Sequence, residues 1–283
     1  IALEGIMVVG GLIGVVMINI MNAAGVPIAL ALIITIGASA LAGAVYSSLL
    51  AFSAINLKAD QTIGGTALNL LAAALAVVVA KRVNGTDSSK ISYSSSVNQH
   101  LNNVNYTFNI GPLTVNWFIV VSVAALAIAW FILYKTRFGM RLMSCGEHPQ
   151  AADSVGINVY KMRWAGVLMS GALGGIGGMA YIVPAVGDWN FETGVAGMGF
   201  LALAVMIFGQ WKPLNIAGAS LFFAVFRAMA NIFDSIPALK ALGWPKEIYN
   251  MMPFIASMVV LAFTSKKSRA PKAEGIPYDQ GKR

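Results

Sequence analysis

Few residues in this sequence could carry out covalent chemistry. Cys145 is the only cysteine, and the histidines His100 and His148 lie far apart in the chain. The chain contains no GxxxxGKS/T phosphate-binding loop and no HExxH, CxxC or GxSxG motif. These are the usual short motifs for nucleotide binding, metal-dependent hydrolysis and nucleophilic catalysis. We therefore expect no catalytic residue, no metal site and no cofactor bound by this chain, which we do not expect to be an enzyme.

The informative polar residues lie inside apolar segments. Glu4 lies near the start of the first segment, and Asn69 lies within TALNLLAAAL. Arg227 and Asn231 lie four residues apart, on one face of a helix. Charged or amide groups in hydrocarbon are costly unless they face a cavity or a polar partner. These side chains are candidates for lining the route of a polar solute, and the alternative is that they form hydrogen bonds between helices.

Composition indicates that these segments belong to a membrane protein. Of 283 residues, 58% are hydrophobic and only 11% are charged, about half the charged fraction of a soluble domain. The apolar runs are continuous and near the ~20 residues of a spanning helix, which disfavours an outer-membrane barrel. We expect an all-α, polytopic helical membrane protein. The net charge of +8 comes from loops and the C-terminus, so the expected surrounding partner is membrane lipid and not nucleic acid.

About eight apolar segments are visible in the sequence. They cover residues 1–21, 26–55, 62–80, 115–134, 164–187, 194–209, 214–233 and 251–264. The chain begins with Ile inside the first segment, so we expect a truncated N-terminus that lacks at least one membrane segment. Residues 26–55 as one helix would be about 45 Å long, so this segment must tilt, break or protrude. Residues 1–264 would form the transmembrane domain, and the basic tail 265–283 is expected to be disordered.

Basic residues predict the orientation of the segments. The polar stretch 135–164 is bordered by Lys135, Arg137, Arg141, Lys161 and Arg163. This stretch and the basic tail should both be cytoplasmic. Four segments separate them, and an even count agrees with one common side. The polar stretch 81–114 and the turn DWNFET (188–193) are then external.

The fifth apolar segment is dense in glycine. Its stretch GALGGIGGMA pairs Gly171 with Gly175 and Gly174 with Gly178, each in a GxxxG spacing. Such spacing lets helix backbones approach closely in a membrane. It predicts a tight bundle and carries no information about a substrate.

Within the cytoplasmic stretch, EHPQAADSVGI predicts a short helix over 149–155. Pro149 suits the first helical position, and Gly156 suits a left-handed terminator. The helix would have about two turns and a length of roughly 10 Å. Ala151, Ala152 and Val155 would give it a small, smooth face. It is either a docking element on the cytoplasmic surface or a mere connection between two spans.

This helix resembles a known motif. Gln150, Ala151 and Ala152, followed after three residues by Gly156, are similar to the EAA-xxx-G loop of ABC importer permeases, although Gln150 replaces the usual Glu and the family's later Pro is not evident. The stretches IALEGIMVVGG, LKADQTIGGTALNLLA, GINVYKMR and GFLALAVMIFGQWKP resemble the nucleoside branch of the ribose and branched-chain amino acid permease superfamily. The resemblance covers nearly the whole chain except 81–114 and the tail.

The resemblance implies a transmembrane permease subunit of an ATP-driven ABC importer for nucleosides, in the bacterial inner membrane with a cytoplasmic C-terminus. A cytosolic ABC ATPase would hold ATP and Mg²⁺. The ATPase would contact Pro149, Gln150, Ala151, Ala152, Val155 and Gly156. A second homologous permease and an external substrate-binding lipoprotein would complete the assembly.

By similarity, Glu4, Asn69 and the turn 188–192 would flank the solute pathway. Trp189 and Phe191 could stack on a base or touch the binding protein. Two alternatives remain open: a ribose-like sugar or amino-acid ABC permease, and a stand-alone secondary transporter. The latter should have charged residues deep in several spans, and this chain has few.

Overall fold

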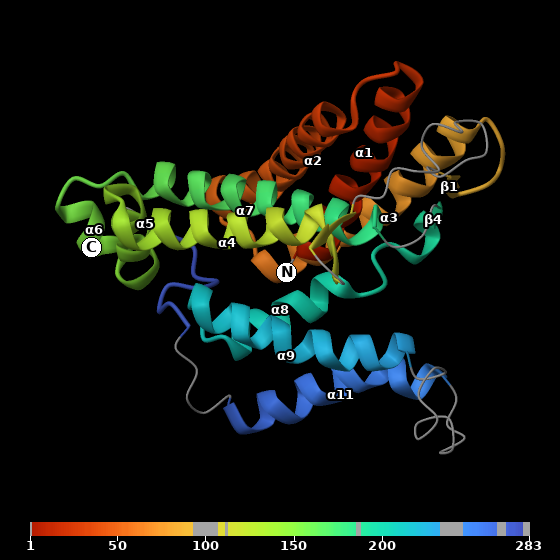
Figure 1. Ribbon diagram of the computed structural model, residues 1–283. Coiled ribbons are helices and arrows are strands. Elements are labelled where there is room, and N and C mark those ends of the chain that lie inside the picture. Colours follow the sequence, from red (N-terminus) through yellow and green to blue (C-terminus); the bar gives the residue numbers. More distant parts are fainter. Residues whose placement is uncertain are drawn as a thin grey trace. The chain divides into compact units, whose positions relative to one another are not determined.

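Helices dominate the computed structural model of the chain, which describes residues 2–92, 107–110, 113–184, 188–232, 246–264 and 270–279 (Figure 1). The α-helices are α1 (Leu3–Ala23), α2 (Ile28–Ala51), α3 (Gln61–Asn84), α4 (Trp117–Lys135), α5 (Arg137–Glu147), α6 (Pro149–Ser154), α7 (Val159–Ile182), α8 (Met198–Phe208), α9 (Pro213–Ile232) and α11 (Lys246–Thr264). The prediction of a mostly helical, polytopic protein is confirmed. Within the described residues, four strands of three or four residues supplement the helices.

Six helical stretches among the described residues are long and apolar enough to cross a membrane. They are Leu3–Ala23, Ala29–Asn56, Gln61–Asn84, Trp117–Lys135, Val159–Ile182 and Phe191–Phe208. Pro213–Met229 is a shorter apolar helix. The predicted count of about eight spans is therefore not confirmed.

The long second segment forms one uninterrupted helix. Helix α2 runs directly into a π-helical turn, Phe52–Asn56, in which the Leu57 N–H donates to the Phe52 carbonyl, 3.1 Å away. The chain turns at Lys58, whose φ is 53°. The Asp60 carboxylate then accepts hydrogen bonds from the first turn of α3, an N-cap arrangement that fixes where α3 begins.

The chain divides into two units, residues 1–199 with 273–283 and residues 200–272. In the smaller unit α9 packs on α11. Phe208 meets Phe222 and Phe223 with ring centroids 6.0 Å apart, and Phe222 also meets Phe226. These aromatic contacts between α8 and α9, together with the close approach of Gly209 to Ile216, stabilise the packing inside that unit.

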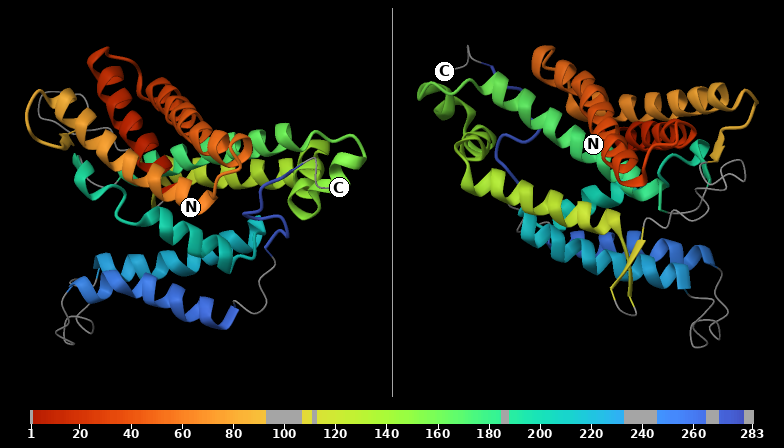
Figure 2. Two further views of the ribbon diagram at one scale, coloured as in Figure 1. Left: turned by 180° about the vertical axis from the view of Figure 1, so that it is seen from behind. Right: turned by 45° about the horizontal axis from the view of Figure 1, so that its top comes forward.

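In the larger unit, α1, α2 and α7 lie against one another (Figures 1 and 2). Glycine permits this approach: a Cβ atom on Gly175 would overlap the Ser39 carbonyl of α2, and one on Gly178 would overlap the Met7 carbonyl of α1. Because lipid provides no hydrophobic driving force between helices, close van der Waals contact of this kind holds a membrane bundle together. The predicted tight packing through the GxxxG spacings is confirmed.

Two short sheets lie outside the helical core. Strand β1 (Lys90–Ser92) pairs antiparallel with β4 (Asp188–Asn190), so the loop after α3 and the turn after α7 lie together, as the alternation of sides requires. Strand β2 (Thr107–Ile110) pairs with β3 (Leu113–Asn116) just before α4. Most of the remaining predicted external loop 81–114, including His100, lies outside the described residues.

The C-terminal tail departs from its predicted disorder. Residues 273–279 lie against α5 and α7 within the larger unit: the Ala273 N–H donates to the Gly146 carbonyl, and Arg163 donates to the Ile276 carbonyl. The basic, Pro-containing composition favoured disorder, but the aromatic side chain of Tyr278 is buried, while Ile276 stays exposed. The expectation of disorder was wrong for residues 273–279.

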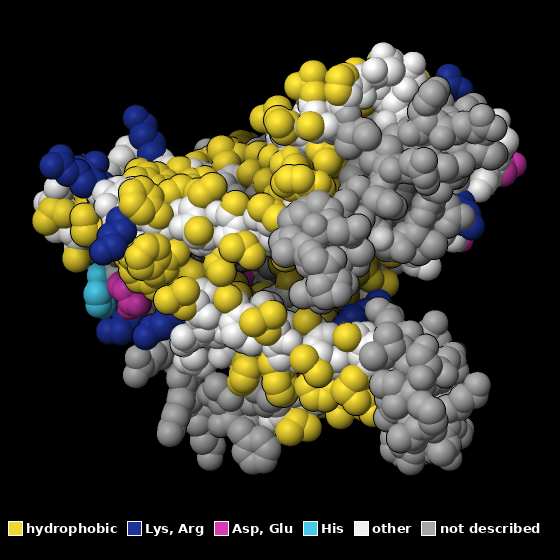
Figure 3. All heavy atoms as spheres, viewed as in Figure 1, with side chains coloured by type: hydrophobic (Ala, Val, Ile, Leu, Met, Phe, Trp, Pro, Cys, Tyr) yellow, Lys and Arg dark blue, Asp and Glu magenta, His cyan; other side chains and the backbone are white. Residues whose placement is uncertain are grey.

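Charged and apolar side chains separate along the larger unit. Figure 3 shows hydrophobic side chains over α4 and α7, and Lys and Arg side chains gathered around the end that carries α5 and α6. Helix α4 is apolar and largely exposed. An apolar belt with basic residues at its edge is the expected surface of a membrane-embedded helical unit.

We predict opposite effects for two matched alanine substitutions on α7. Gly175→Ala should lower thermal stability in detergent, since its methyl group would overlap α2 backbone and overpacking costs about 1–3 kcal/mol. Gly177→Ala should leave stability unchanged or raise it, since a Cβ there has open space and Ala favours a helix over Gly. Melting monitored by size-exclusion chromatography checks this. Equal melting temperatures for the two variants would contradict glycine-mediated packing.

Candidate functional site

The polar stretch 135–164 folds into a helical corner built by local capping. The Thr136 hydroxyl accepts from the Gly139 N–H and begins α5, and the Asn158 side chain accepts from the Lys161 N–H and begins α7. Gly139 allows a tight turn between α4 and α5, because a Cβ there would overlap the Ile132 carbonyl. The short helix α6 is held between α5 and α7.

The predicted short helix is confirmed as α6, Pro149–Ser154, with Pro149 at its N-terminus. Gly156 has φ of 83°. Its N–H donates to the Asp153 carbonyl, and the Ile157 N–H donates to the Ala152 carbonyl. These two bonds make a Schellman motif, which requires the left-handed conformation that Gly adopts without strain. Two residue types, Pro and Gly, therefore fix both ends of the helix.

The faces of α6 differ from the smooth face expected from sequence. Pro149 and Ala152 are buried, and Ala152 packs with Cys145 and Val159 on the inner side. Gln150, Ala151, Ser154 and Val155 are exposed, and the Val155 side chain is 74% exposed. We call these four residues the coupling face. An exposed valine at the tip of a polar corner is a ready apolar anchor for a partner protein.

Exposed basic side chains lie on the helices that flank α6. Arg137, Arg141 and Lys161 are exposed, and Figure 3 shows Lys and Arg side chains at this end of the unit. The acidic residues Glu147 and Asp153 lie at the same corner, so its surface carries both signs of charge.

Glu4 connects α1 to the segment that leads into α8. Its two carboxylate oxygens accept from the N–H groups of Gly197, at 3.0 Å, and Gly199, at 2.7 Å. Gly199 is the second residue of α8. A carboxylate that accepts helix N-terminal N–H groups is favourable in charge as well as in hydrogen bonding.

Asn69 lies beside Glu4 and ties α3 to α1. Its Oδ1 accepts from the Gly5 N–H at 2.8 Å. Gly5 suits this place because a Cβ there would press on Ala72 and on the Leu68 carbonyl. The structure thus brings Glu4, Asn69 and the segment before α8 together around the start of α1, and both side chains make hydrogen bonds between helices.

The two aromatic residues of the 188–192 turn are turned inward. The Trp189 indole N–H donates to the Gly194 carbonyl at 2.8 Å, and its ring meets Tyr181 edge-on, 5.6 Å between centroids. Phe191 is fully buried. Sequence reasoning allowed these rings to stack on a base or to touch the binding protein; in the structure they hold the turn in place, and either contact stays a prediction.

Arg227 and Asn231 both lie on α9 of the smaller unit, four residues apart as predicted. The Arg227 side chain is half-buried. The surroundings of the Asn231 side chain lie outside the described residues. These two residues therefore stay pathway predictions.

Sequence reasoning missed polar residues that the structure brings together. The Ser89 hydroxyl lies 2.8 Å from both Asn190 Oδ1 and Glu192 Oε1, which links the loop after α3 to the turn after α7. Ser47 of α2 donates toward the Val167 carbonyl of α7. Small hydroxyl residues in apolar runs could have indicated the latter, since they permit close helix contact. Tyr278 was missed because nothing near it in sequence reveals its partners.

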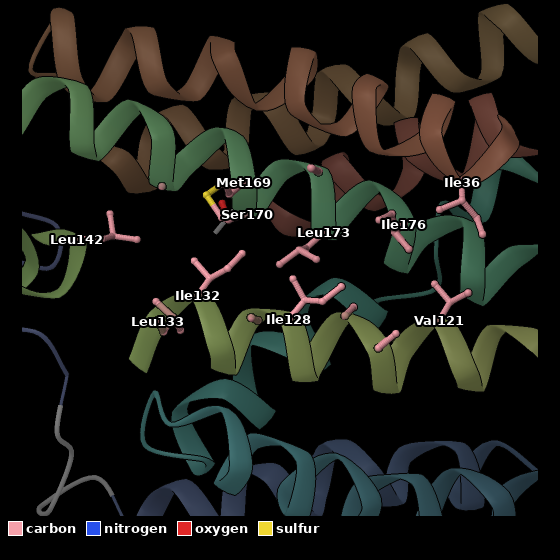
Figure 4. A pocket seen from close by; sticks show the side chains of 15 residues that line it. Ile36, Val121, Ile128, Ile132, Leu133, Leu142, Met169, Ser170, Leu173 and Ile176 are labelled. Atoms are coloured by element: carbon pink, nitrogen blue, oxygen red, sulfur yellow. The ribbon is translucent and has the colours of Figure 1, made fainter. Parts of the chain in front are cut away.

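An apolar cavity of about 550 Å³ lies between α4 and α7. Figure 4 shows Ile128 and Ile132 of α4 opposite Leu173 and Ile176 of α7, with Ile36 of α2 at one end. Ser170 supplies the only side-chain hydroxyl of the lining, and that hydroxyl already donates to the Val167 carbonyl. A polar solute would lose its hydrogen bonds to water there without replacement. This cavity therefore does not suit a hydrophilic pathway.

Comparisons with known proteins agree with this picture. The family model described as branched-chain amino acid transport system / permease component matches residues 1–262. The nucleoside ABC transporter permease protein NupC of Lactococcus lactis is 39% identical over 100% of this chain and 88% of its own length. The guanosine ABC transporter permease protein NupQ of Bacillus subtilis is 37% identical with the same coverage of both chains.

A third relative has a different named substrate. The glucose ABC transporter permease protein TsgB13 of Haloferax volcanii is 26% identical over 57% of this chain and 40% of its own length. No solved structure matches the chain significantly. The family match covers nearly all of the sequence, and the predicted transport subunit, rather than an enzyme, is confirmed. The chain belongs to the permease-component family of the branched-chain amino acid transport systems.

Proposed function

We propose that this chain is the transmembrane permease subunit of an ATP-driven ABC importer for nucleosides. The observation that carries the proposal is its similarity, over its whole length, to permeases named for nucleosides and guanosine. The exposed short helix α6 supports the same function. A permease subunit without a nucleotide-binding motif must bind a separate ATPase, and α6 offers a surface for that contact.

The coupling face would dock into a groove on a cytosolic ABC ATPase. The ATPase would hold ATP and Mg²⁺, and this chain would hold neither. Val155 would enter the groove, while the inner side of α6 passes the displacement to α7 through Ala152 and Val159. Because α7 also packs on α1 and α2, a push at α6 would act on the helices of the larger unit.

The solute pathway would pass near Glu4, Asn69 and the segment before α8. These residues connect α1, α3 and the start of α8 by hydrogen bonds. Arg227 and Asn231 of α9 would be further pathway residues. A nucleoside offers hydroxyl and base groups to such polar side chains, and alternating access would expose them first to one side and then to the other.

The assembly would include three partners in a bacterial plasma membrane. They are the ATPase, a second homologous permease, and an external substrate-binding lipoprotein. The exposed basic residues beside α6 support a cytoplasmic position for α5, α6 and the C-terminus. The paired strands β1 and β4 would then lie on the external side, where the binding protein delivers its solute.

A sugar importer is the second candidate, favoured by the relative named for glucose. An amino-acid ABC permease remains a further alternative within the family. A stand-alone secondary transporter is less well supported, because the described spans contain few charged residues for ion coupling.

The first prediction concerns the coupling face. Val155→Asp should lower nucleoside uptake about tenfold or more, because a carboxylate placed against an apolar groove costs at least about 1.4 kcal/mol. The matched control is Val83→Asp, the same substitution of an exposed valine at the far end of α3, which should transport normally. Uptake and copurification of the ATPase with the permease are the measurements. Normal uptake by Val155→Asp would refute docking through α6.

The second prediction concerns substrate and energy source. Cells should accumulate labelled guanosine, and unlabelled nucleosides should compete while ribose, glucose and branched-chain amino acids should not. Deletion of the partner ATPase gene should abolish this uptake. Competition by glucose would favour the sugar candidate, and uptake that persists without the ATPase would overturn the ABC proposal.

The third prediction separates the two roles open to Glu4. Glu4→Ala leaves the N–H groups of Gly197 and Gly199 without their acceptor, and an unpaired buried polar group costs about 1–3 kcal/mol. We expect a lower melting temperature for this variant, whereas Ala in place of the exposed Glu147 should melt like the parent chain. An unchanged melting temperature with lost uptake would show instead that Glu4 acts on the solute.

A further inference from the structure

The C-terminal segment 273–279 lies on the corner that carries α6. The Ala273 N–H donates to the carbonyl of Gly146, the residue before the end of α5, at 3.0 Å. Further along, Arg163 of α7 donates through Nη1 to the Ile276 carbonyl at 2.9 Å. The segment thus makes backbone-directed hydrogen bonds to the helices on both sides of α6. Figure 1 shows the chain returning to this corner near its C-terminus.

Tyr278 fills the inner side of the corner. Its side chain is only 5% exposed and shares a cluster with Cys145, Ala152 and Val159. The ring meets Tyr160 of α7 edge-on, with 5.4 Å between centroids, and the Arg163 guanidinium lies 5.9 Å from the ring centroid. Both arrangements are favourable for aromatic rings. Since Ala152 is one of the two buried residues of α6, Tyr278 belongs to the layer on which α6 rests.

The segment ends on a second loop at the same end of the unit. Asp279 forms an ion pair with Lys58, with 3.0 Å between Oδ1 and Nζ. Lys58 lies in the turn between the π-helical end of α2 and α3. Both side chains are partly exposed, so this pair contributes little to stability. The pair instead fixes the position of the segment, because it attaches the segment's end to the turn after α2.

Helix α6 needs such support because it is too short to be stable alone. It has six residues, well below the about 12 to 15 that an isolated helix requires even with favourable sequence. Its position therefore depends on what lies beneath it. A partner that pushes on the exposed Val155 can displace α7 only if the side chains packed between α6 and α7 keep their positions.

We propose that residues 273–279 form a strap that holds α6 against α5 and α7, and that Tyr278 is a positioning residue for coupling between the ATPase and the permease. The strap's functional part rests on the proposed docking of α6. Its structural part does not, because it concerns contacts within this chain alone. The strap transmits force by filling the space behind α6 and makes no contact with solute or nucleotide.

Cys145 provides a direct reporter of the strap. It is the chain's single cysteine, it is 3% exposed, and burial raises the pKa of its thiol, an effect that nearby Arg163 partly offsets. Reaction with a maleimide needs both access and thiolate. In inverted membrane vesicles Cys145 of the parent chain should therefore react slowly with the maleimide. Mass spectrometry identifies the modified peptide.

The experiment compares four variants in these vesicles. Tyr278→Ala and a chain that ends after Lys272 should label about tenfold faster, as local opening exposes a buried thiol. Tyr278→Phe keeps the ring and should label slowly, and a chain that ends after Asp279 keeps the strap and should label at the parent rate. Unchanged labelling in both strap-deficient variants would overturn the strap.

Reconstituted complexes then test the functional part by nucleoside uptake per ATP hydrolysed. Tyr278→Ala should reduce this ratio about tenfold while the ATPase still copurifies, because a loosened α6 binds but does not transmit. Tyr278→Phe should restore the ratio. If Val155→Asp abolishes uptake but Tyr278→Ala keeps the parent ratio, the strap proposal fails and docking stands. If Val155→Asp transports normally while Cys145 is exposed by Tyr278→Ala, docking fails and the strap is only structural.

Discussion

The rest of the larger unit depends on the close backbone contact of α7 with α1 and α2. Gly175 and Gly178 bring α7 onto carbonyl groups of the two neighbouring helices, where any side chain would separate them. In a membrane no hydrophobic force pulls apolar helices together, so packing distance decides whether the bundle holds. The polar contacts of Glu4 and Asn69 lie at the edge of this bundle and tie its helices to α3 and to the start of α8.

Helix α7 links the two functional regions. Its first turn packs beneath α6 through Val159, its glycine-rich middle contacts α1 and α2, and its last residues lead into β4 and the turn that holds Trp189. A displacement of α6 by an ATPase would therefore reach the polar contacts near Glu4 through one continuous, tightly packed element. Packed, continuous elements of this kind carry energetic coupling between distant sites.

Local rules predicted much of this from the sequence. Continuous hydropathy located the six described spans but not the predicted count of about eight. Pro149 and Gly156 predicted α6, and the GxxxG spacings predicted close packing. Long-range contacts were beyond those rules. The inward position of Ala152, the burial of Phe191 and the pairing of β1 with β4 each depend on partners distant in sequence. Tyr278 shows the same limit. Its tail is basic and contains two prolines, which suggests disorder, yet the Tyr278 ring packs into a cluster formed by α5, α6 and α7.

In the proposed function, ATP bound on the α6 side drives nucleoside movement through this permease. The most direct test is uptake of labelled guanosine into proteoliposomes that contain the purified complex. Helix α6 faces the lumen, where ATP is enclosed, and the binding protein is added outside. We expect guanosine to accumulate only with enclosed ATP, and accumulation to stop when the nucleotide is replaced by a form that cannot be hydrolysed. Accumulation without ATP, or driven by an imposed ion gradient alone, would contradict it.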